Sequence, residues 1–394
     1  MSNCWRFLQL FALAFSLTAC GSTTESTQKT SSSSGTNPEC TASSGTGNSP
    51  KPGSDSTIQP GAGSHSKISQ PNGVIPMSAQ NRAAAMQAFA KDIAATRGLK
   101  ESQVLAVLNE AKLNPTVIRI VTPPPPGQPR PARSWQTYRN RFVEPIRIRA
   151  GRAFIKDYQA ELARAESRYG VPAEVIAAII GVETLYGKQM GNFRVLDALY
   201  SLAFDYPDPN RPDRQEMFRN QLADLIELHL QGKLNALTLK GSYAGAIGIP
   251  QFMPGSIKRF ALSAKGESGS IDLTLDTSDA IVSVANFLVA HGWQRGLPVF
   301  APVVLPRDPK RLVDGGLTPK LDWTQLQAAG ATLKPGATAG NWTKSALGVI
   351  DLPEEPAGTV EYRTATPNFF ALTMYNRSYF YAATVADLAS ALGR

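Results

Sequence analysis

The stretch Val171–Met190, VPAEVIAAIIGVETLYGKQM, decides how the rest of this chain folds. Pro172 suits the first turn of a helix, where its missing N–H group is not needed. The segment Val175–Val182 is apolar on every side of such a helix, apart from one glycine. A helix of this kind is buried on nearly all sides in a folded protein. The stretch therefore predicts a helix at the centre of a mainly α-helical core.

Glu183 is the carboxylate at the end of this apolar run. Apolar surroundings disfavour the ionised form of a carboxylate and raise its pKa, which suits a general acid near neutral pH. The alternative is a helix-end glutamate that faces water, as most glutamates do. On this stretch alone, both interpretations remain open.

The chain begins with features of an exported lipoprotein. Phe7–Thr18 is almost wholly apolar and too short to span a bilayer, so residues 1–19 are predicted to be a signal peptide. Leu17–Cys20 resembles a bacterial lipobox, which predicts that Cys20 is lipidated. The alternative is an ordinary exported protein that is cleaved nearby. Gly21 follows the cysteine in place of the Asp associated with inner-membrane retention, so the outer membrane is favoured.

Residues 20–77 are rich in Ser, Thr, Gly and Pro and contain no Phe, Tyr or Trp. They cannot form a core, so we expect a disordered tether. Cys40 lies in this tether and no cysteine follows it, so disulfides and cysteine metal sites are excluded from the rest of the chain. The net charge is +9, but no dense Lys/Arg run interleaved with aromatics indicates a nucleic-acid partner. We expect a monomer without cofactors.

The folded part is predicted to be residues 78–394, in four segments. Helical patterns interrupted by a Pro-rich strip predict an α subdomain in residues 78–150. Residues 151–296 hold the central helix and further amphipathic helices, and are expected to form the core. Residues 297–366 consist of short β-rich pieces separated by Pro and Gly, which predicts a β-containing insertion. Residues 367–394 return to a helical pattern that we expect to rejoin the core.

A second informative stretch is Lys240–Pro254, KGSYAGAIGIPQFMP. Its glycines let backbone and ligand approach each other closely. Ser242 and Gln251 can hydrogen-bond a sugar hydroxyl or acetamido group, and Phe252 offers a face for stacking. The alternative is a Gly-rich connector between elements. A phosphate-binding loop is excluded because no Lys-Ser/Thr pair follows the glycines.

The third stretch is Tyr375–Tyr381, YNRSYFY. So many rings exceed what one amphipathic helix needs for packing, and sugar-binding sites use Tyr and Asn side chains of this kind. Core packing is the alternative.

Taken together, Gly181–Thr184, Gly241–Pro254 and Tyr375–Tyr381 resemble the lytic murein transglycosylase B family, membrane-bound lipoprotein enzymes that cut peptidoglycan. The resemblance extends from about residue 78 to the C-terminus. It implies a mainly α fold, with a lysozyme-like α core, an N-terminal α subdomain and a small β-containing inserted subdomain. It also implies that Glu183 is the single catalytic acid/base. The residues that it places along the saccharide are Ser242, Gln251, Phe252, Tyr375, Asn376 and Tyr381.

The sequence departs from the family pattern at two places. Some members resemble a calcium-binding EF-hand in the segment that corresponds to Leu262–Asp272. Such a loop needs several closely spaced carboxylates, and this segment has only Glu267 and Asp272, so no metal site is predicted. Phe287 stands where the pattern has a tyrosine, and it is not included in the expected site.

The sequence offers one well-placed carboxylate, whereas ordinary glycosidases use two. We expect Asp197 to cap or form an ion pair, and Asp205 and Asp208 to lie in a loop. A lone Glu183 fits the transglycosylase reaction on the β-1,4 bond between MurNAc and GlcNAc. The acid protonates the bridging oxygen, and its carboxylate then takes the proton of the muramyl C6 hydroxyl that attacks C1, which gives a 1,6-anhydroMurNAc end without water. A hydrolytic muramidase and a non-catalytic peptidoglycan-binding envelope lipoprotein remain alternatives.

Overall fold

The computed structural model of the protein describes residues 78–266 and 269–393. The predicted signal peptide, Cys20 and the whole predicted tether lie outside these residues. The described residues belong to one compact unit, in which buried apolar side chains form three clusters. Within this part of the chain, no helix has the length and apolar character needed to cross a membrane.

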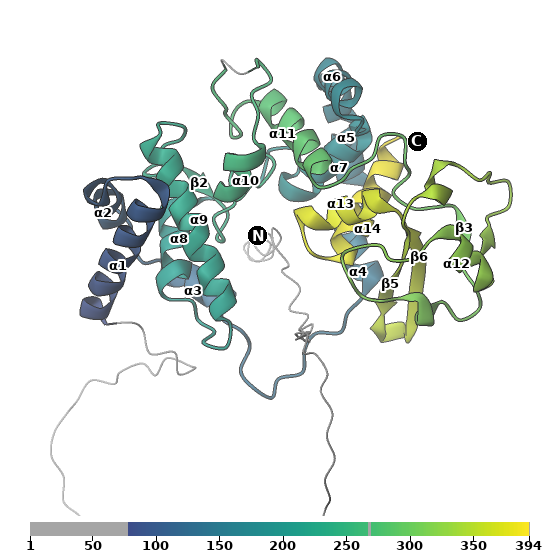
Figure 1. Ribbon diagram of the computed structural model, residues 1–394, viewed down its shortest axis with the longest axis horizontal. Helices are drawn as coiled ribbons and strands as arrows, with labels where there is room; N and C mark the ends of the chain where they lie inside the picture. The colour runs from purple at the N-terminus through teal and green to yellow at the C-terminus, as the bar shows by residue number, and fades with distance from the viewer. Residues whose placement is uncertain (1–77, 267–268, 394) are drawn as a thin grey trace, which may run out of the picture. The chain divides into compact units, whose positions relative to one another are not determined.

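The first cluster holds α7, the helix predicted to be central, together with the helices that cover it (Figure 1). It also takes in Ile249 and Phe252 from the C-terminal half of the Gly-rich stretch, which places that half beside α7. Its helices are α4 (Trp135–Asn140), α5 (Pro145–Asp157), α6 (Gln159–Tyr169), α7 (Ala173–Thr184), α10 (Pro254–Phe260), α11 (Thr277–Ala290), α13 (Pro367–Tyr375) and α14 (Tyr379–Leu392).

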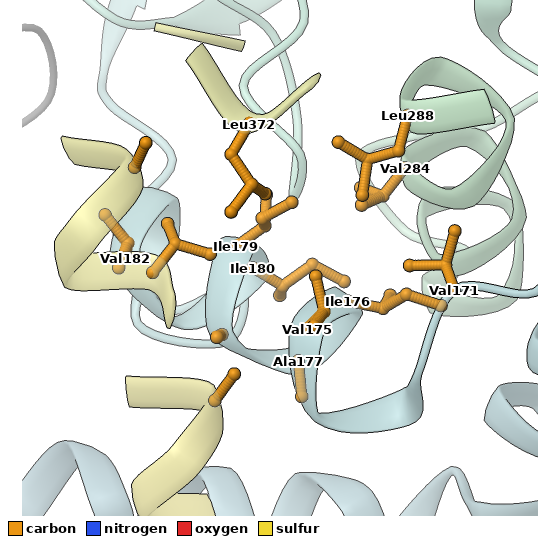
Figure 2. Packing of buried hydrophobic residues seen from close by; sticks show 14 of the residues in the cluster. Val171, Val175, Ile176, Ala177, Ile179, Ile180, Val182, Val284, Leu288 and Leu372 are labelled. Atoms are coloured by element: carbon orange, nitrogen blue, oxygen red, sulfur yellow. The ribbon is translucent and has the colours of Figure 1, made fainter. Parts of the chain in front are cut away.

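Helix α7 is buried on all sides, as its sequence predicts. Every residue from Val175 to Val182 is buried, because α5, α6, α11 and α14 all pack against the helix. Figure 2 shows its side chains meeting Val284 and Leu288 of α11 and Leu372 of α13. Full burial of one such aliphatic side chain stabilises a fold by about 1.5–3 kcal/mol, so this helix fixes the core around it.

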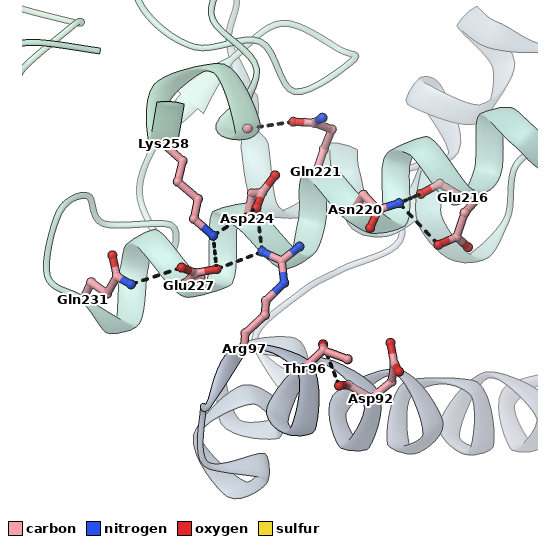
Figure 3. Close-up of polar contacts among 11 residues, drawn as sticks. Asp92, Thr96, Arg97, Glu216, Asn220, Gln221, Asp224, Glu227, Gln231 and Lys258 are labelled. Atoms are coloured by element: carbon pink, nitrogen blue, oxygen red, sulfur yellow. Dashed lines mark hydrogen bonds and ion pairs between the residues drawn. The ribbon is translucent and has the colours of Figure 1, made fainter. Parts of the chain in front are cut away.

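The second cluster holds α1 (Ala79–Arg97), α2 (Glu101–Asn109), α3 (Pro115–Val121), α8 (Val195–Phe204) and α9 (Pro212–Leu230). An ion-pair network links two of these helices to α10 (Figure 3). Arg97, the last residue of α1, contacts Asp224 at 2.5 Å and Glu227 at 2.9 Å on successive turns of α9. Lys258 of α10 contacts the same Glu227 carboxylate at 2.6 Å. The network therefore holds α10, which directly follows the Gly-rich stretch, against α9.

The clusters divide the chain differently from the predicted boundary at residue 150. Trp135 and Phe142 belong to the first cluster, with α7, whereas α8 and α9 belong to the second, with α1–α3. The physical reason lies in α8, which is apolar almost all round and buries nine of its ten residues. Such a helix needs cover on several sides, and the single apolar stripes of α1–α3 and α9 supply it.

The third cluster lies in the segment where the sequence predicts a β-containing insertion. Leu326, Trp342 and Leu347 are central to it, and short antiparallel strands surround them. The long hairpin pairs Gly348 with Ala365 through to Glu354 with Thr359. The elements are β3 (Val303–Val304), η1 (Pro309–Leu312), α12 (Trp323–Ala328), β4 (Thr332–Leu333), η2 (Asn341–Lys344), β5 (Gly348–Glu354), η3 (Glu355–Ala357) and β6 (Thr359–Ala365).

Candidate active site

Glu183 and Thr184 lie in the last turn of α7, and a hydrogen bond joins this turn to the Gly-rich stretch. The Thr184 hydroxyl donates to the carbonyl oxygen of Ile249 at 2.8 Å and accepts from the backbone N–H of Gly187 at 2.9 Å. The helix ends there because Leu185 is in the left-handed region, with a φ of 50°. The Glu183 carboxylate therefore projects from the end of a buried helix rather than from its middle.

Burial raises the pKa of Glu183 from an ordinary value of 4.5 to about 7, and the hydrogen bond from Tyr381 lowers it in part. The Tyr381 hydroxyl donates to Glu183 Oε1 at 2.6 Å. Because Oε1 accepts this hydrogen bond, Oε2 is the oxygen left to carry a transferable proton. Near neutral pH this carboxyl group can both donate and accept a proton, which is the requirement for general acid–base catalysis.

Tyr381 is placed by the start of α14. Ser378 caps this helix by accepting from the backbone N–H of Tyr381 at 3.4 Å, and the Tyr381 side chain is only 2% exposed. Burial and the nearby Glu183 charge raise the pKa of Tyr381 well above its usual value. The hydroxyl therefore stays protonated and remains a hydrogen-bond donor to the carboxylate.

The Gly-rich stretch folds back on itself beside α7. Its first residues form β2 (Lys240–Gly241), which pairs with β1 (Phe193–Arg194), and Ile247 bridges to both Gly241 and Phe252. Gly241 is required here, because a Cβ atom on it would lie 2.2 Å from the Ala246 carbonyl oxygen. Ser242 is buried, and its hydroxyl accepts from the backbone N–H of Ala246 at 3.0 Å. In this structure Ser242 holds the turn together.

Gln251 carries an unsatisfied polar atom in this stretch. Its backbone has a φ of 52°, which is strained for a residue other than glycine. The side-chain Nε2 donates to the carbonyl oxygens of Gly248 at 2.8 Å and Met190 at 3.2 Å. Oε1 is buried and has no hydrogen-bond partner among the described residues. A buried acceptor without a donor is unusual in a folded protein, so the fold alone does not satisfy the Gln251 side chain.

The rings of Phe252 and Tyr375 are in contact, but Phe252 is buried whereas Tyr375 is partly exposed. The Tyr375 hydroxyl donates to the carbonyl oxygen of Pro250 at 2.6 Å, and its ring stacks on Tyr381 with centroids 6.3 Å apart. The Phe252 ring is 2% exposed and packs against both Tyr375 and Phe287. With so little of its surface open, Phe252 supports Tyr375 instead of offering the stacking face that the sequence suggested. Phe287 belongs to the same aromatic packing.

Asn376 lies at the end of α13, next to Tyr375, and is partly exposed. Its side-chain amide forms no hydrogen bond with other described residues, so it is available to a ligand. The structure thus brings the ends of α7 and α13, the start of α14 and the Gly-rich stretch into one site. Three hydrogen bonds join them: Thr184 to Ile249, Tyr375 to Pro250 and Tyr381 to Glu183.

Comparison with known proteins identifies the family of this chain. Residues 81–390 match the family described as transglycosylase SLT domain. The chain belongs to this family. Membrane-bound lytic murein transglycosylase B of Escherichia coli is 36% identical over 315 residues, which cover 78% of this chain and 82% of that protein. The lytic transglycosylase predicted from the three stretches is confirmed.

Two solved structures show the same fold. Soluble lytic transglycosylase SltB1 of Pseudomonas aeruginosa has a TM-score of 0.68 and 33% identity, over 79% of this chain and 98% of that one. SltB3 of the same organism, in complex with NAG-anhNAM-pentapeptide, has a TM-score of 0.64 and 27% identity, over 79% of each chain. The mainly α, lysozyme-like fold class is confirmed by these similarities.

Sequence reasoning missed Tyr138 in this transglycosylase. The Glu183 charge is the second cause, after burial, of a raised pKa of the Tyr138 phenol, which places the two groups near each other. The Tyr138 ring also packs on Phe380, the neighbour of Tyr381, with centroids 5.5 Å apart. No local signal marks Tyr138, because it lies on the short helix α4 in a segment of otherwise ordinary helical composition.

The other carboxylates considered from the sequence form ion pairs or backbone hydrogen bonds away from Glu183. Asp197 pairs with Arg194 at 2.5 Å, and Asp205 pairs with Arg82 at 2.9 Å. Asp208 accepts from a backbone N–H group in its own loop at 3.0 Å. Among the described residues, none of these acids contributes to the shifted pKa of Glu183. Glu183 therefore has no second carboxylate beside it in this part of the chain.

In the segment that corresponds to the EF-hand of some members, the described acid Asp272 makes backbone contacts, and Asp279 of α11 holds the segment in the same way. Asp279 accepts from the N–H groups of Ala264 and Asp272, and Asp272 accepts from Thr274 and Leu275. Outside residues 267–268, which are not described, no three His, Cys, Asp or Glu side chains gather there as metal ligands would. The absence of a tight calcium site stays a prediction.

The raised pKa of Glu183 predicts a pH-dependent stability. Between pH 4.5 and about 7, the folded protein holds a proton that the unfolded chain has lost, so the free energy of unfolding falls as the pH rises. Glu183→Gln removes the titrating group, so the variant should not show this fall in the free energy of unfolding. From pH 4 to pH 8 the variant should gain on the order of 2 kcal/mol relative to the unmodified protein, allowing for partial solvent exposure. Urea unfolding at both pH values measures the difference, and an equal difference at both values would contradict the burial of this carboxyl group.

Proposed function

We propose that this protein cleaves the β-1,4 bond between MurNAc and GlcNAc in peptidoglycan without water, with Glu183 as general acid and then general base. The observation that supports this most directly is the single carboxyl group with a pKa of about 7, hydrogen-bonded by Tyr381 and without a second carboxylate beside it. Hydrolysis by two carboxylates would need a second acid beside Glu183, and none of the described residues supplies one.

In the first step, Glu183 Oε2 donates its proton to the glycosidic oxygen while the bond from that oxygen to C1 of MurNAc breaks. GlcNAc leaves with a hydroxyl group at C4, and Glu183 becomes a carboxylate. The Tyr381 hydroxyl, 2.6 Å from Oε1, stabilises the negative charge that develops.

In the second step, the C6 hydroxyl of the same MurNAc attacks C1 and gives its proton to the Glu183 carboxylate. The bond from C1 to O6 closes the 1,6-anhydro ring, and Glu183 returns to its acid form. Because the nucleophile belongs to the substrate, the protein does not need to supply one. The SltB3 structure in complex with NAG-anhNAM-pentapeptide supports an anhydro sugar as ligand of a related site.

The remaining site residues are proposed to hold the saccharide. Gln251 Oε1 lacks a donor and is buried, so the Gln251 side chain would have to turn outward to accept from a sugar hydroxyl or acetamido N–H group. The free Asn376 amide would bind the same saccharide. The partly exposed Tyr375 ring would cover a sugar face. For Ser242 and Phe252 we propose supporting roles, in the turn and behind Tyr375 respectively.

Digestion of purified sacculi tests the reaction. Mass spectrometry of the released muropeptides should find 1,6-anhydroMurNAc ends. Reducing ends would indicate a hydrolytic muramidase, and the absence of release would indicate a non-catalytic binding protein.

We expect Gln251→Ala and Asn376→Ala to weaken glycan binding by about 1–3 kcal/mol each, since each removes a hydrogen-bonding group proposed to contact the glycan. Gln251→Ala also removes the hydrogen bonds of Nε2 to Gly248 and Met190, so it should lower the melting temperature as well. Melting temperature should change little for Asn376→Ala, whose amide has no protein partner. Titration of an inactive background, Glu183→Gln, with chitooligosaccharides measures binding without turnover. A variant that unfolds while its surviving fraction binds normally would show a structural role instead.

We also propose that Cys20 is lipidated and attaches the protein to a membrane of the cell envelope, with the outer membrane favoured by the residue after the cysteine. The Escherichia coli relative is named as membrane-bound. Cys20→Ala should move the protein from the detergent phase to the aqueous phase, with activity on isolated sacculi retained. If the variant partitions with membranes as the unmodified protein does, the lipobox interpretation is wrong.

A further inference from the structure

The turn that follows Glu183 is strained. Leu185 and Tyr186 both adopt left-handed backbone, with φ of 50° and 59°, before Gly187 at 84°. Glycine takes this conformation freely, but for Leu and Tyr it persists only where the surroundings hold it in place. The surroundings of Tyr186 therefore bear on the geometry of Glu183, three residues earlier.

The Tyr186 ring occupies space left open by two glycines on two helices. A Cβ atom on Gly181 of α7 would lie 2.5 Å from the Tyr186 hydroxyl oxygen, and one on Gly151 of α5 would lie 2.2 Å from it. Both distances are shorter than any real contact. The ring also packs on Phe154 of α5, with centroids 5.3 Å apart. Tyr186 thus fills the space between α5 and the last turns of α7.

Hydrogen bonds fix the same turn from α5. The Tyr186 hydroxyl donates to the carbonyl oxygen of Arg147 at 3.2 Å. The Arg147 Nε donates in turn to the carbonyl oxygen of Gly181 at 3.0 Å, and Gly181 also accepts from the backbone N–H of Leu185 at 3.2 Å. Glu183 lies midway between these two residues, so its backbone position depends on contacts that Tyr186 and Arg147 make.

We propose that Tyr186 is a positioning residue for Glu183, whose ring, seated against Gly151 and Gly181, fixes the last turn of α7 and keeps the carboxyl group against the Tyr381 hydroxyl. This inference rests on the proposed function of Glu183. A displacement of about 1 Å in a reacting group can lower a rate by about 10²-fold, so a residue that sets this position affects turnover without touching the substrate. The ring also keeps water out of the space behind the turn.

The test compares Tyr186→Leu with Tyr158→Leu. The Tyr158 ring packs on the same Phe154, at 4.9 Å, but belongs to the junction of α5 and α6. Tyr186→Leu should lower kcat about 10–100-fold with little change in KM. The alkaline limb of its pH profile should move to lower pH, because water admitted near Glu183 lowers the pKa of the carboxyl group. Tyr158→Leu should lower the melting temperature and leave both kcat and the alkaline limb of the pH profile unchanged. Tyr186→Phe keeps the ring, so its kcat should stay within about threefold of that of the unmodified protein.

Gly181→Ala tests the contact between the Tyr186 ring and α7 without removing the ring. Alanine favours a helix over glycine, yet the added methyl group collides with Tyr186, so kcat should fall much as it does in Tyr186→Leu. In a Tyr186→Ala background the same substitution should cause no further loss, because the ring is absent. This non-additivity is the signature of a direct contact. If the Tyr186 variants do not fold, the kcat of Gly181→Ala compared with that of Tyr158→Leu still tests the contact.

The inference is overturned if Tyr186→Leu and Tyr158→Leu have equal kcat and equal alkaline limbs, or if the effects of Gly181→Ala and Tyr186→Ala add. The proposed function fails by a different result, which is full activity of Glu183→Gln. If Glu183→Gln is inactive and the two leucine variants behave alike, only the positioning role of Tyr186 is wrong.

Discussion

Glu183→Gln is expected to abolish the release of muropeptides from sacculi while the fold persists. The change keeps the size of the side chain and its hydrogen bond with Tyr381, but removes the proton that the glycosidic oxygen must receive. General acid–base groups contribute typically ~10²–10⁴-fold, and here no second carboxylate beside Glu183 can take over. The loss should therefore lie at or beyond the upper end of that range.

The matched control is Glu174→Gln, which makes the same change at the first turn of the same helix. It should retain full activity. Chromatography of anhydro-muropeptides measures both variants, and circular dichroism checks that both are folded. Release by Glu183→Gln at a rate close to that of the unmodified protein would remove Glu183 from the role of general acid.

Tyr381→Phe is expected to lower kcat about 10²-fold, as the loss of one preorganised donor to a developing anion typically does. The ring and its stacking on Tyr375 remain, so KM should change little. Because the hydrogen bond from Tyr381 lowers the pKa of Glu183, its removal should raise that pKa further. The alkaline limb of the activity profile should then move to higher pH, the opposite direction to that expected for Tyr186→Leu.

Tyr379→Phe serves as the control for Tyr381→Phe. The Tyr379 hydroxyl, at the start of the same helix, donates to the carbonyl oxygen of Gly316 in the insertion, whereas the hydroxyl that donates to Glu183 is that of Tyr381. The control should leave the pH profile unchanged. A Tyr381→Phe variant with the kcat and alkaline limb of the unmodified protein would show that its hydroxyl does not act on Glu183.

The sequence by itself determined the central helix and the carboxylate at its end. A run in which every helical face is apolar can be stable only under cover from all sides, so Val175–Val182 predicts its own burial. Glu183 follows that run directly, and its raised pKa is a consequence of the same burial. Both features depend on neighbours in sequence, which is why local reasoning reaches them.

Only the tertiary structure decided which distant side chains meet Glu183. Tyr381 lies 198 residues away, and residues without a local signal, such as Tyr138, approach it through the packing of α4 and α14. The burial of Phe252 and the packing of α8 in one cluster with α1–α3 were also decided by contacts between elements that are distant in the sequence. An apolar face specifies that it must be covered but not by which element, because the hydrophobic effect has no direction. The choice of partners follows from how all the helices pack together, and the site is a product of that packing.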